Sequence, residues 1–224
     1  MAASGPSGPV PKAPGVGIRI EHLTTNGTFS IDGEDFDVVN NIWLLGDDHE
    51  VVVIDAAHDA APIVEAIGDR SVKAIVCTHG HNDHINAAEA LSRAEKGAPV
   101  LLHPADEMLW DAVYPDHKPD GALAEGAELE VAGTALRVLH TPGHSPGGIC
   151  LVGPEGHVFG GDTLFKGGPG ATGRSYSDFP TIIESIRDRL LTLPGSTVVH
   201  TGHGDSTTIA DEAPHLDEWI SRGH

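Results

Sequence analysis

Four short apolar runs in this chain each end in a glycine-containing loop that carries histidine or aspartate. The runs are residues 72–77, 135–140, 157–160 and 197–200, and the loops after them carry residues 79–84, His144, Asp162 and His203 respectively. Runs of this length and composition are typical of buried strands. Because loops at one edge of a sheet bring together residues that are distant in the sequence, the pattern predicts a sheet-based fold with a polar site at that edge.

The first of these loops is the densest, with the sequence Cys-Thr-His-Gly-His-Asn-Asp-His over residues 77–84. It places three imidazoles and a carboxylate between His79 and His84. Those groups are the ligands that Zn²⁺, Fe²⁺ and Mn²⁺ take in proteins. A polar loop after a buried strand is the alternative interpretation, and it explains one histidine better than three. The loop therefore predicts a metal site.

The candidate ligands are too numerous for a single cation, which takes about four to six. Seven suit two cations that share one carboxylate, and Asp162 is the candidate for that bridge. The seven are His79, His81, Asp83, His84, His144, Asp162 and His203.

Length and composition predict a single globular domain behind a disordered arm. The chain has 224 residues, enough for one sizeable core. Residues 1–15 are rich in glycine and proline and lack the apolar segment of a signal peptide, so we expect an arm there and one domain over residues 16–224. No apolar stretch approaches the roughly 20 residues of a membrane-spanning helix. We expect a cytoplasmic protein that does not contact the membrane.

The charge and the cysteines narrow the class of partner. Thirteen Lys and Arg against 33 Asp and Glu give a net charge of −20, which argues against nucleic-acid binding. Cys77 and Cys150 both lie in apolar runs and are predicted to be buried thiols in a reducing compartment, not a disulfide. The expected partner is a small-molecule substrate, and the oligomeric state is left open.

The secondary-structure pattern predicts a layered α/β domain. Strands are expected at residues 17–20, 36–45 and 51–56, followed by elements that alternate between helix and strand. The clearest helix is 179–193, where apolar residues recur at helical spacing before Pro194 and Gly195 end it. The other expected helices are residues 60–67, 85–94, 106–113 and 214–222.

The motif His79-x-His81-x-Asp83-His84, with His144, Asp162 and His203, resembles that of the metallo-β-lactamase superfamily. The resemblance runs from about Val16 to the C-terminus. It implies an αββα sandwich, with two mixed β-sheets flanked by helices and a metal site at one edge. Asp55 matches the first motif of the superfamily, which implies that its side chain orients a ligand histidine.

The segments Thr78-His79, 141–145 and 161–165 are similar to the glyoxalase II (hydroxyacylglutathione hydrolase) branch. This resemblance implies that His79, His81 and His144 hold a first metal, that Asp83, His84 and His203 hold a second, and that Asp162 bridges them. Only 21 residues follow His203, so the helical domain that binds glutathione in full-length members is not expected. The chain resembles the short single-domain members, and glutathione recognition does not carry over.

The expected function is that of a dinuclear metal-dependent hydrolase, a thioesterase that cleaves S-acyl conjugates of a low-molecular-weight thiol. Zinc is the preferred metal, with iron or manganese as alternatives. A hydroxide shared by the two cations would attack the thioester carbonyl, and the sulfur would leave without strong general-acid help. Asp162, as the bridge, and Asp83, as a group able to return a proton, are the predicted catalytic carboxylates.

Substrate contacts are predicted in the glycine-rich loop of residues 166–177 that follows the bridging aspartate. Lys166, Arg174 and Tyr176 there could hold an anionic thiol carrier, and His58 could line the pocket. The alternative is that this loop is simply solvated.

Other functions remain open on the same residues. A persulfide dioxygenase-like oxidoreductase would hold a single iron with His79, His144 and Asp162. The substrate could also be another ester or thioester, such as an acyl- or formyl-mycothiol. A non-catalytic metal-binding protein and another hydrolase, such as a phosphodiesterase, are the remaining alternatives.

Overall fold

Two six-stranded sheets face each other in the computed structural model, which describes residues 17–223. The predicted arm, residues 1–15, lies outside the described residues. The first sheet has the strand order β1-β2-β3-β4-β5-β6. Its strands are β1 (Arg19–Ile31), β2 (Glu34–Gly46), β3 (Glu50–Ile54), β4 (Ser71–Val76), β5 (Val100–Leu102) and β6 (Gly121–Ala122).

The second sheet has the order β14-β13-β10-β9-β8-β7 and, like the first, mixes parallel and antiparallel pairs. Its strands are β7 (Glu128–Val131), β8 (Thr134–His140), β9 (Ile149–Val152), β10 (His157–Gly161), β13 (Val198–Thr201) and β14 (Thr207–Thr208). A separate two-stranded ribbon joins β11 (Leu164–Phe165) to β12 (Gly168–Pro169).

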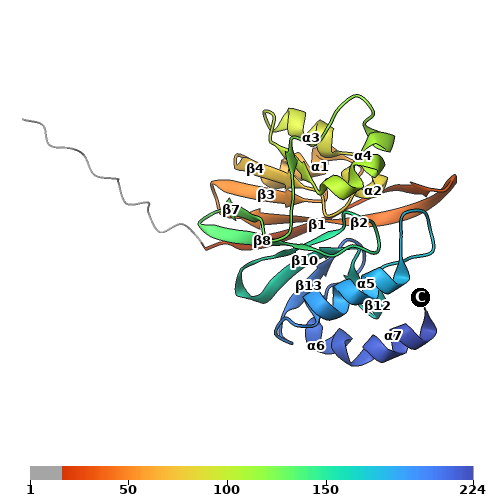
Figure 1. The fold of residues 1–224 in the computed structure, drawn as a ribbon. Helices are drawn as coiled ribbons and strands as arrows, with labels where there is room; N and C mark the ends of the chain where they lie inside the picture. The colour runs from red at the N-terminus through yellow and green to blue at the C-terminus, as the bar shows by residue number, and fades with distance from the viewer. Residues whose placement is uncertain (1–16, 224) are drawn as a thin grey trace, which may run out of the picture.

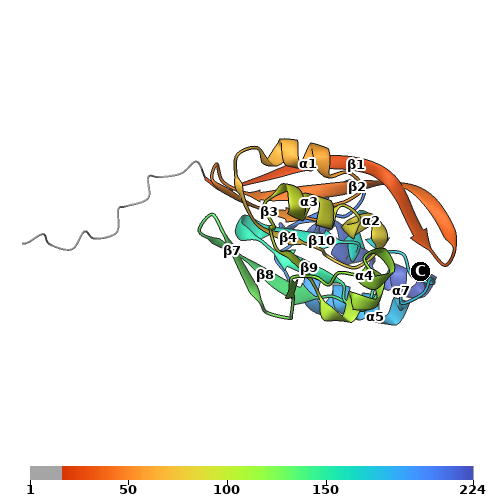
Figure 2. The ribbon, with the colours of Figure 1, turned by 90° about the horizontal axis from the view of Figure 1, so that it is seen from above.

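Helices cover the outer face of each sheet, as Figures 1 and 2 show. The first sheet carries α1 (Ala60–Ile67), α2 (Asn82–Ile85), α3 (Ala88–Ala94) and α4 (Glu107–Val113). The second carries α5 (Phe179–Ser185), α6 (Ile209–Glu212) and α7 (Leu216–Arg222). The αββα sandwich predicted from the sequence is confirmed. Within residues 17–223, none of the helices has the length and apolarity needed to span a membrane.

The central strands are buried on both faces, which explains why they form unbroken apolar runs instead of alternating ones. In β2, Ile42 and Leu44 pack with the helices, whereas Trp43 and Leu45 pack between the sheets. A third apolar cluster lies between the second sheet and its helices, around Ile182 of α5. Both predicted buried cysteines are buried and free.

Several elements differ from the predictions in their extent. The strand predicted at residues 17–20 begins at Arg19 and continues to Ile31, where Asp32 and Gly33, with φ of 53° and 78°, form a tight hairpin turn into β2. The predicted helix 85–94 is divided into α2 and α3. The predicted helix 179–193 is α-helical only to Ser185 and then continues as a π-helical turn over Ile186–Leu190.

Candidate metal centre

The structure brings all seven predicted ligands together at one edge of the sandwich. They come from loops that follow β4, β8, β10 and β13 and from the short helix α2. Their ligating atoms form three overlapping groups, each within 4.8 Å. The groups are His79, His81 and His144; His79, His84 and Asp162; and Asp83, His84 and His203.

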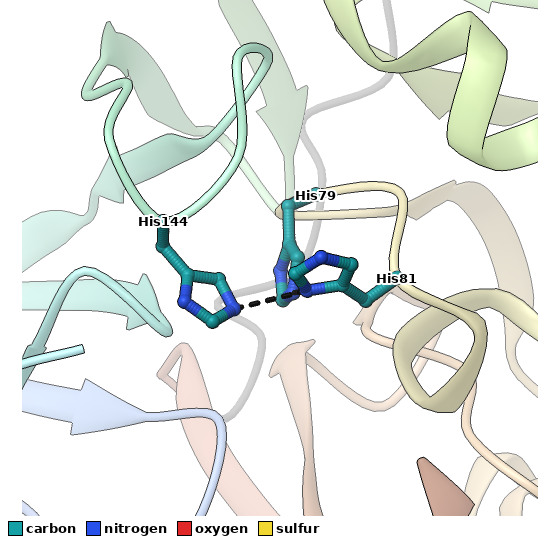
Figure 3. A group of neighbouring side chains, drawn as sticks. All are labelled: His79, His81 and His144. Carbon is teal, nitrogen blue, oxygen red and sulfur yellow. Dashed lines mark hydrogen bonds between the residues drawn. The ribbon is translucent and has the colours of Figure 1, made fainter. Parts of the chain in front are cut away.

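The first group, which we call the three-histidine group, consists of His79, His81 and His144 (Figure 3). His81 Nδ1 lies 3.0 Å from His79 Nε2 and 3.0 Å from His144 Nε2. All three side chains are buried. Two of them come from the loop after β4 and the third from the loop after β8, so the group joins the two sheets.

The second group, which we call the mixed group, consists of Asp83, His84 and His203. His84 Nε2 lies 3.2 Å from His203 Nε2, and Asp83 Oδ2 lies 3.3 Å from His203 Nε2 and 3.5 Å from His84 Nε2. Asp83 and His84 are adjacent on α2, whereas His203 reaches the group from the loop after β13. The mixed group therefore contains one carboxylate where the three-histidine group has none.

Asp162 lies between the two groups. Its Oδ1 is 3.4 Å from His84 Nε2, while its Oδ2 is 3.5 Å from His144 Nε2 and 3.4 Å from His203 Nε2. The loop after β13 approaches so closely that a Cβ at Gly202 would lie 2.2 Å from Asp162 Oδ1. Glycine at position 202 is therefore a condition for this geometry.

Four of the five histidines have their outer ring nitrogen committed to an acceptor. His144 Nδ1 donates to the carbonyl of Ala171 and His203 Nδ1 to that of Val39, each at 2.8 Å. His84 Nδ1 donates to Asp55 Oδ2 at 2.9 Å, and His79 Nδ1 lies 3.2 Å from Thr78 Oγ1. In the neutral ring each of these bonds leaves the lone pair of Nε2 aimed at the centre.

Asp55 has the orienting position that the resemblance implied. It follows β3, with a φ of 60°, and its carboxylate accepts hydrogen bonds from the Thr78 backbone at 2.7 Å and the Thr78 hydroxyl at 2.8 Å. Because this hydroxyl donates to Asp55, it can accept from His79. One carboxylate thus orients His84 directly and His79 through Thr78.

Asp106 is a buried carboxylate whose role the sequence did not indicate. It accepts hydrogen bonds from the Gly80 backbone at 2.8 Å, the Ser145 hydroxyl at 2.7 Å and the Gly147 backbone at 2.5 Å. It therefore connects the loop that carries His79 and His81 to the loop that carries His144. Burial raises the pKa of Asp106, and the three hydrogen bonds oppose that rise.

Two adjacent asparagines of β2 support the mixed group and were also missed. Asn40 Nδ2 donates to Asp83 Oδ2 at 3.0 Å. Asn41 Nδ2 donates to the carbonyls of Thr201 at 3.0 Å and Gly204 at 2.9 Å, on either side of His203. Both side chains are buried, and they connect the first sheet to the loop after β13.

The two groups differ in their affinity for protons. Burial, together with the neighbouring histidines, holds the pKa of His79 well below its usual range and lowers the pKa of His81 to about 3. Burial also opposes charge on His84 and His203, but Asp162 and Asp83 outweigh it, raising the pKa of His84 well above its usual range and that of His203 to about 10. Burial also opposes the charge of Asp162, but His84 and His203 outweigh it and hold the pKa of Asp162 well below its usual range.

The residues fit divalent cations. Zinc binds imidazole nitrogen at about 2.0–2.1 Å, which places neighbouring ligand atoms of a tetrahedral site roughly 3.3 Å apart. The pairs of neighbouring ligand atoms given above are separated by 3.0 to 3.5 Å, and all atoms within a group lie within 4.8 Å of one another. Asp83 Oδ1 and Asp162 Oδ1 are buried and have no hydrogen-bond partner. Unpaired buried carboxylate oxygens are costly unless a cation compensates them, so the cluster is able to hold metals.

A cavity of about 230 Å³, which we call the metal cavity, opens over the centre. His81, Asp83, His144, Asp162 and His203 contribute to its lining. Its remaining walls are apolar and come from Phe29, Val38, Phe165 and Ala171. The candidate metal ligands and the apolar side chains therefore line the same cavity.

The predicted substrate contacts lie outside the metal cavity. Lys166 Nζ is paired with Asp205 at 3.1 Å, and Arg174 is paired with Glu34 at 2.6 Å. Tyr176 lines a different cavity, described below.

His58 lies behind Asn40 and does not line the metal cavity either. Its Nε2 donates to Asn40 Oδ1 at 2.9 Å, and Asn86 donates to its Nδ1 at 3.1 Å. Burial lowers the pKa of His58. A neutral His58 thus fixes the amide of Asn40 with its nitrogen toward Asp83.

A family model of known proteins matches most of the chain. Residues 35–203 match the model of the metallo-β-lactamase superfamily. The chain belongs to the metallo-β-lactamase superfamily. Members of this superfamily are mostly metal-dependent hydrolases, and the superfamily predicted from the motif is confirmed.

One relative carries the name of the branch that the sequence resembles, and two solved structures are similar in fold. The hydroxyacylglutathione hydrolase GloC of Haemophilus influenzae is 34% identical over 191 residues, covering 77% of this chain and 89% of GloC. The protein TTHA1623, solved in a di-iron-bound form, has a TM-score of 0.67 and 34% identity over 78% of this chain and 92% of its own. ETHE1 from Myxococcus xanthus has a TM-score of 0.69 and 25% identity, covering 89% of each chain.

Proposed function

We propose that this protein is a dinuclear metal-dependent hydrolase that cleaves thioesters of a low-molecular-weight thiol. The observation that carries the proposal is the set of histidines whose outer nitrogens are held by fixed acceptors, with Asp162 between them. Such a set directs lone pairs and carboxylate oxygens toward two adjacent positions.

The ligand roles follow the two groups. The three-histidine group, His79, His81 and His144, would hold one cation. The mixed group, Asp83, His84 and His203, would hold the other, and Asp162 would bridge them. Imidazole and carboxylate ligands suit zinc, iron and manganese alike. Because TTHA1623 was solved in a di-iron-bound form, we propose iron as well as zinc for this site.

Divalent cations at these positions supply Lewis acidity, which activates water and polarises a carbonyl. Hydrolysis adds the hydroxyl of water to the acyl carbon and its proton to sulfur as the carbon–sulfur bond breaks. Asp83 would take that proton and return it to the sulfur through the carboxylate oxygen that does not hold the cation. Asn40 donates to Asp83 Oδ2 and keeps the carboxylate in place.

The thioester assignment is supported by the cavity and by the relatives. The apolar walls of the metal cavity, Phe29, Val38 and Phe165, suit an acyl group next to the metal ligands. GloC, a relative at 34% identity, is named for hydrolysis of a glutathione thioester. A thiolate needs little proton assistance to leave, which agrees with a site whose lining includes no lysine or tyrosine.

Metal content and thiol release test the proposal together. The purified full chain is stripped with a chelator, reloaded with zinc, iron or manganese, and supplied with a panel of thioesters while free thiol is measured. We expect two metals per chain and thiol release that requires them. The Asp83→Asn variant should lose most of the activity, whereas Asp111→Asn, at a position on α4 remote from the centre, should not. Thiol release by the stripped protein would contradict the proposal.

A persulfide dioxygenase-like oxidoreductase is the second candidate, favoured by the similarity to ETHE1 of Myxococcus xanthus. It would use a single iron held by His79, His144 and Asp162. The presence of Asp83, His84 and His203 argues against this function, because a site with a single iron does not require these three further ligands. Oxygen consumption and sulfite production from a persulfide, with one iron per chain, would establish this function instead.

A further inference from the structure

A second cavity, of about 240 Å³, adjoins the metal cavity, and we call it the outer cavity. The two share His81, which lines both. Leu109, Ala112 and Val113 of α4 contribute to one side of the outer cavity, and Ser30 and Tyr176 contribute hydroxyl groups. A ligand that extends from the metal cavity past His81 would enter this second chamber.

Ser175 and Tyr176 line one side of this chamber, and their backbone segment is attached to the tip of the β1–β2 hairpin. Asp32 in the hairpin turn accepts hydrogen bonds from the Ser175 backbone at 3.1 Å and the Ser175 hydroxyl at 2.5 Å. Arg174 pairs with Glu34, and its guanidinium lies over the ring of Phe36 at 5.4 Å. In Figure 1 the loop before α5 rises beside the end of the hairpin.

The two basic residues that the sequence analysis proposed for binding an anionic carrier are both paired with acidic side chains. Arg174 is neutralised by Glu34, and Lys166 is paired with Asp205 at the surface. Among residues 17–223, no lysine or arginine lines either of the two cavities. Asp32 adds a carboxylate to the outer cavity, and the whole chain carries a net charge of −20. An anionic group placed there would meet like charge and no counter-ion.

The two chambers also differ in polarity. The metal cavity has apolar walls apart from the ligands, whereas the outer cavity combines the apolar face of α4 with Tyr176 and with Ser30, whose hydroxyl donates to Asp35 at 2.7 Å and can still accept. Tyr176 is 58% exposed, so its hydroxyl can meet both solvent and a ligand. An acyl group suits the first chamber, and a neutral group with hydrogen-bonding atoms suits the second.

We propose that the outer cavity receives the thiol carrier and selects carriers without net negative charge. The acyl group then lies in the metal cavity, and the scissile carbon–sulfur bond lies near His81, where the chambers meet. This inference rests on the thioesterase function proposed above and specifies its substrate class: thioesters of uncharged, polar thiols.

A matched pair of substrates isolates the charge of the carrier. The acetyl thioesters of mercaptopropionamide and mercaptopropionate have carriers of nearly equal size that differ in one negative charge. Each kcat/KM is measured on the metal-loaded protein and divided by the rate of hydroxide-driven hydrolysis of the same ester. We expect the amide to be favoured about tenfold, with a smaller ratio at high salt. A preference for the carboxylate would overturn the inference while leaving the thioesterase function intact.

A variant that adds a cation to the wall of the chamber tests its location. Ala112 is exposed on α4 and lines the outer cavity, so Ala112→Lys adds a positive charge without disturbing the core. Ala94→Lys adds the same charge at an exposed position on α3 outside both cavities. We expect only Ala112→Lys to raise the ratio of kcat/KM for the carboxylate thioester to kcat/KM for the amide thioester, by about fivefold, through the KM of the carboxylate thioester.

The outcomes separate the two proposals. Equal effects of the two lysine variants would show that the carrier does not occupy the outer cavity. Hydrolysis of neither thioester by the metal-loaded protein would instead refute the thioesterase function itself.

Discussion

The three-histidine group and the mixed group are neighbours with Asp162 between them, yet they differ in whether protons compete with a cation for the ligand atoms. In the first group, the low pKa values of His79 and His81 keep these two side chains neutral, so their lone pairs are available to a cation near neutral pH. In the mixed group the raised pKa values of His84 and His203 mean that protons occupy the nitrogens until a cation displaces them. Proximity within one centre therefore does not make the two positions equivalent.

The two groups also differ in how they are supported. Asp106 connects the loops of the three-histidine group in the protein interior. The mixed group depends on His203, whose side chain is 26% exposed and is held from β2 through Val39 and Asn41. We therefore expect the three-histidine group to bind its cation more tightly, and four predictions test this difference.

The largest effect is expected where the two groups meet. Replacement of Asp162 by alanine removes the carboxylate that lies between the two groups, so we expect loss of both metals and at least a thousandfold loss of kcat, an order-of-magnitude figure for removal of metal catalysis. Metal content by elemental analysis, and thiol release, measure the two effects. Asp205→Ala, at an exposed aspartate, is the control; a fully metal-loaded Asp162→Ala protein would refute the bridge.

Single replacements within each group should have unequal effects. His203→Ala should leave one metal per chain, because the buried three-histidine group remains intact. His144→Ala should lower occupancy further, since it breaks the group that binds more tightly. We expect losses of activity of about a hundredfold or more in each variant. Stoichiometry against free metal concentration measures the difference, and identical binding curves would remove the distinction between the groups.

Two supporting carboxylates allow the same comparison without removing a ligand. Asp106→Asn should weaken metal binding by the three-histidine group, whereas Asp55→Asn should chiefly affect the mixed group through His84. Each change is expected to lower metal affinity by about 10- to 100-fold. Competition with a chromophoric chelator measures both. Glu107→Gln, at the exposed position next to Asp106, serves as the control, and unchanged affinity in Asp106→Asn would show that the connection between the loops is dispensable.

The smallest effect concerns His200, whose ring packs against His157 and Trp43 away from the metal centre. Burial and the nearby His157 and His22 lower the pKa of His200 to about 4, with Trp43 packed against its ring at 4.3 Å. Because the unfolded chain takes up a proton at about pH 6.5 and the folded chain does not, stability should fall as pH drops from about 6.5 to 4, by about 2 kcal/mol.

Denaturant unfolding of the metal-free protein at a series of pH values measures this loss. His200→Gln should reduce the pH dependence in that window, and His215→Gln, at an exposed position, should not. Such a loss would show that burial of the His200 ring opposes its protonation in the folded protein. A flat stability profile would contradict this explanation.

The sequence predicted the parts of the centre that share a short segment or end a strand. His79 to His84 occupy six consecutive positions, and Asp162 and His203 follow apolar runs, so their convergence could be inferred from strand ends. Asp106 could not be recognised, because an acidic residue at the start of a helix is ordinary and its partners Ser145 and Gly147 lie about 40 residues away.

The same reason limited the predictions for the substrate side. Arg174 in a glycine-rich loop indicated an anion site, but its partner Glu34 comes from the hairpin tip 140 positions earlier in the chain. The hairpin itself had a readable signal in Asp32–Gly33, a dipeptide that favours a two-residue turn. Because this turn was not used in the prediction, the strand was predicted to end at residue 20. There was therefore no reason to expect Glu34 near Arg174.

The attachment of residues 174–176 to the hairpin tip separates the choice of substrate from the reaction. The hairpin turn and the segment it holds lie at the surface and contribute none of the seven candidate ligands. Insertions, deletions and substitutions at Asp32–Glu34 would alter the shape and charge of the outer chamber while the ligand loops stay as they are. Substitutions in this one turn could thus change the thiol that related proteins accept. A library of variants confined to the turn should yield altered specificity with retained turnover.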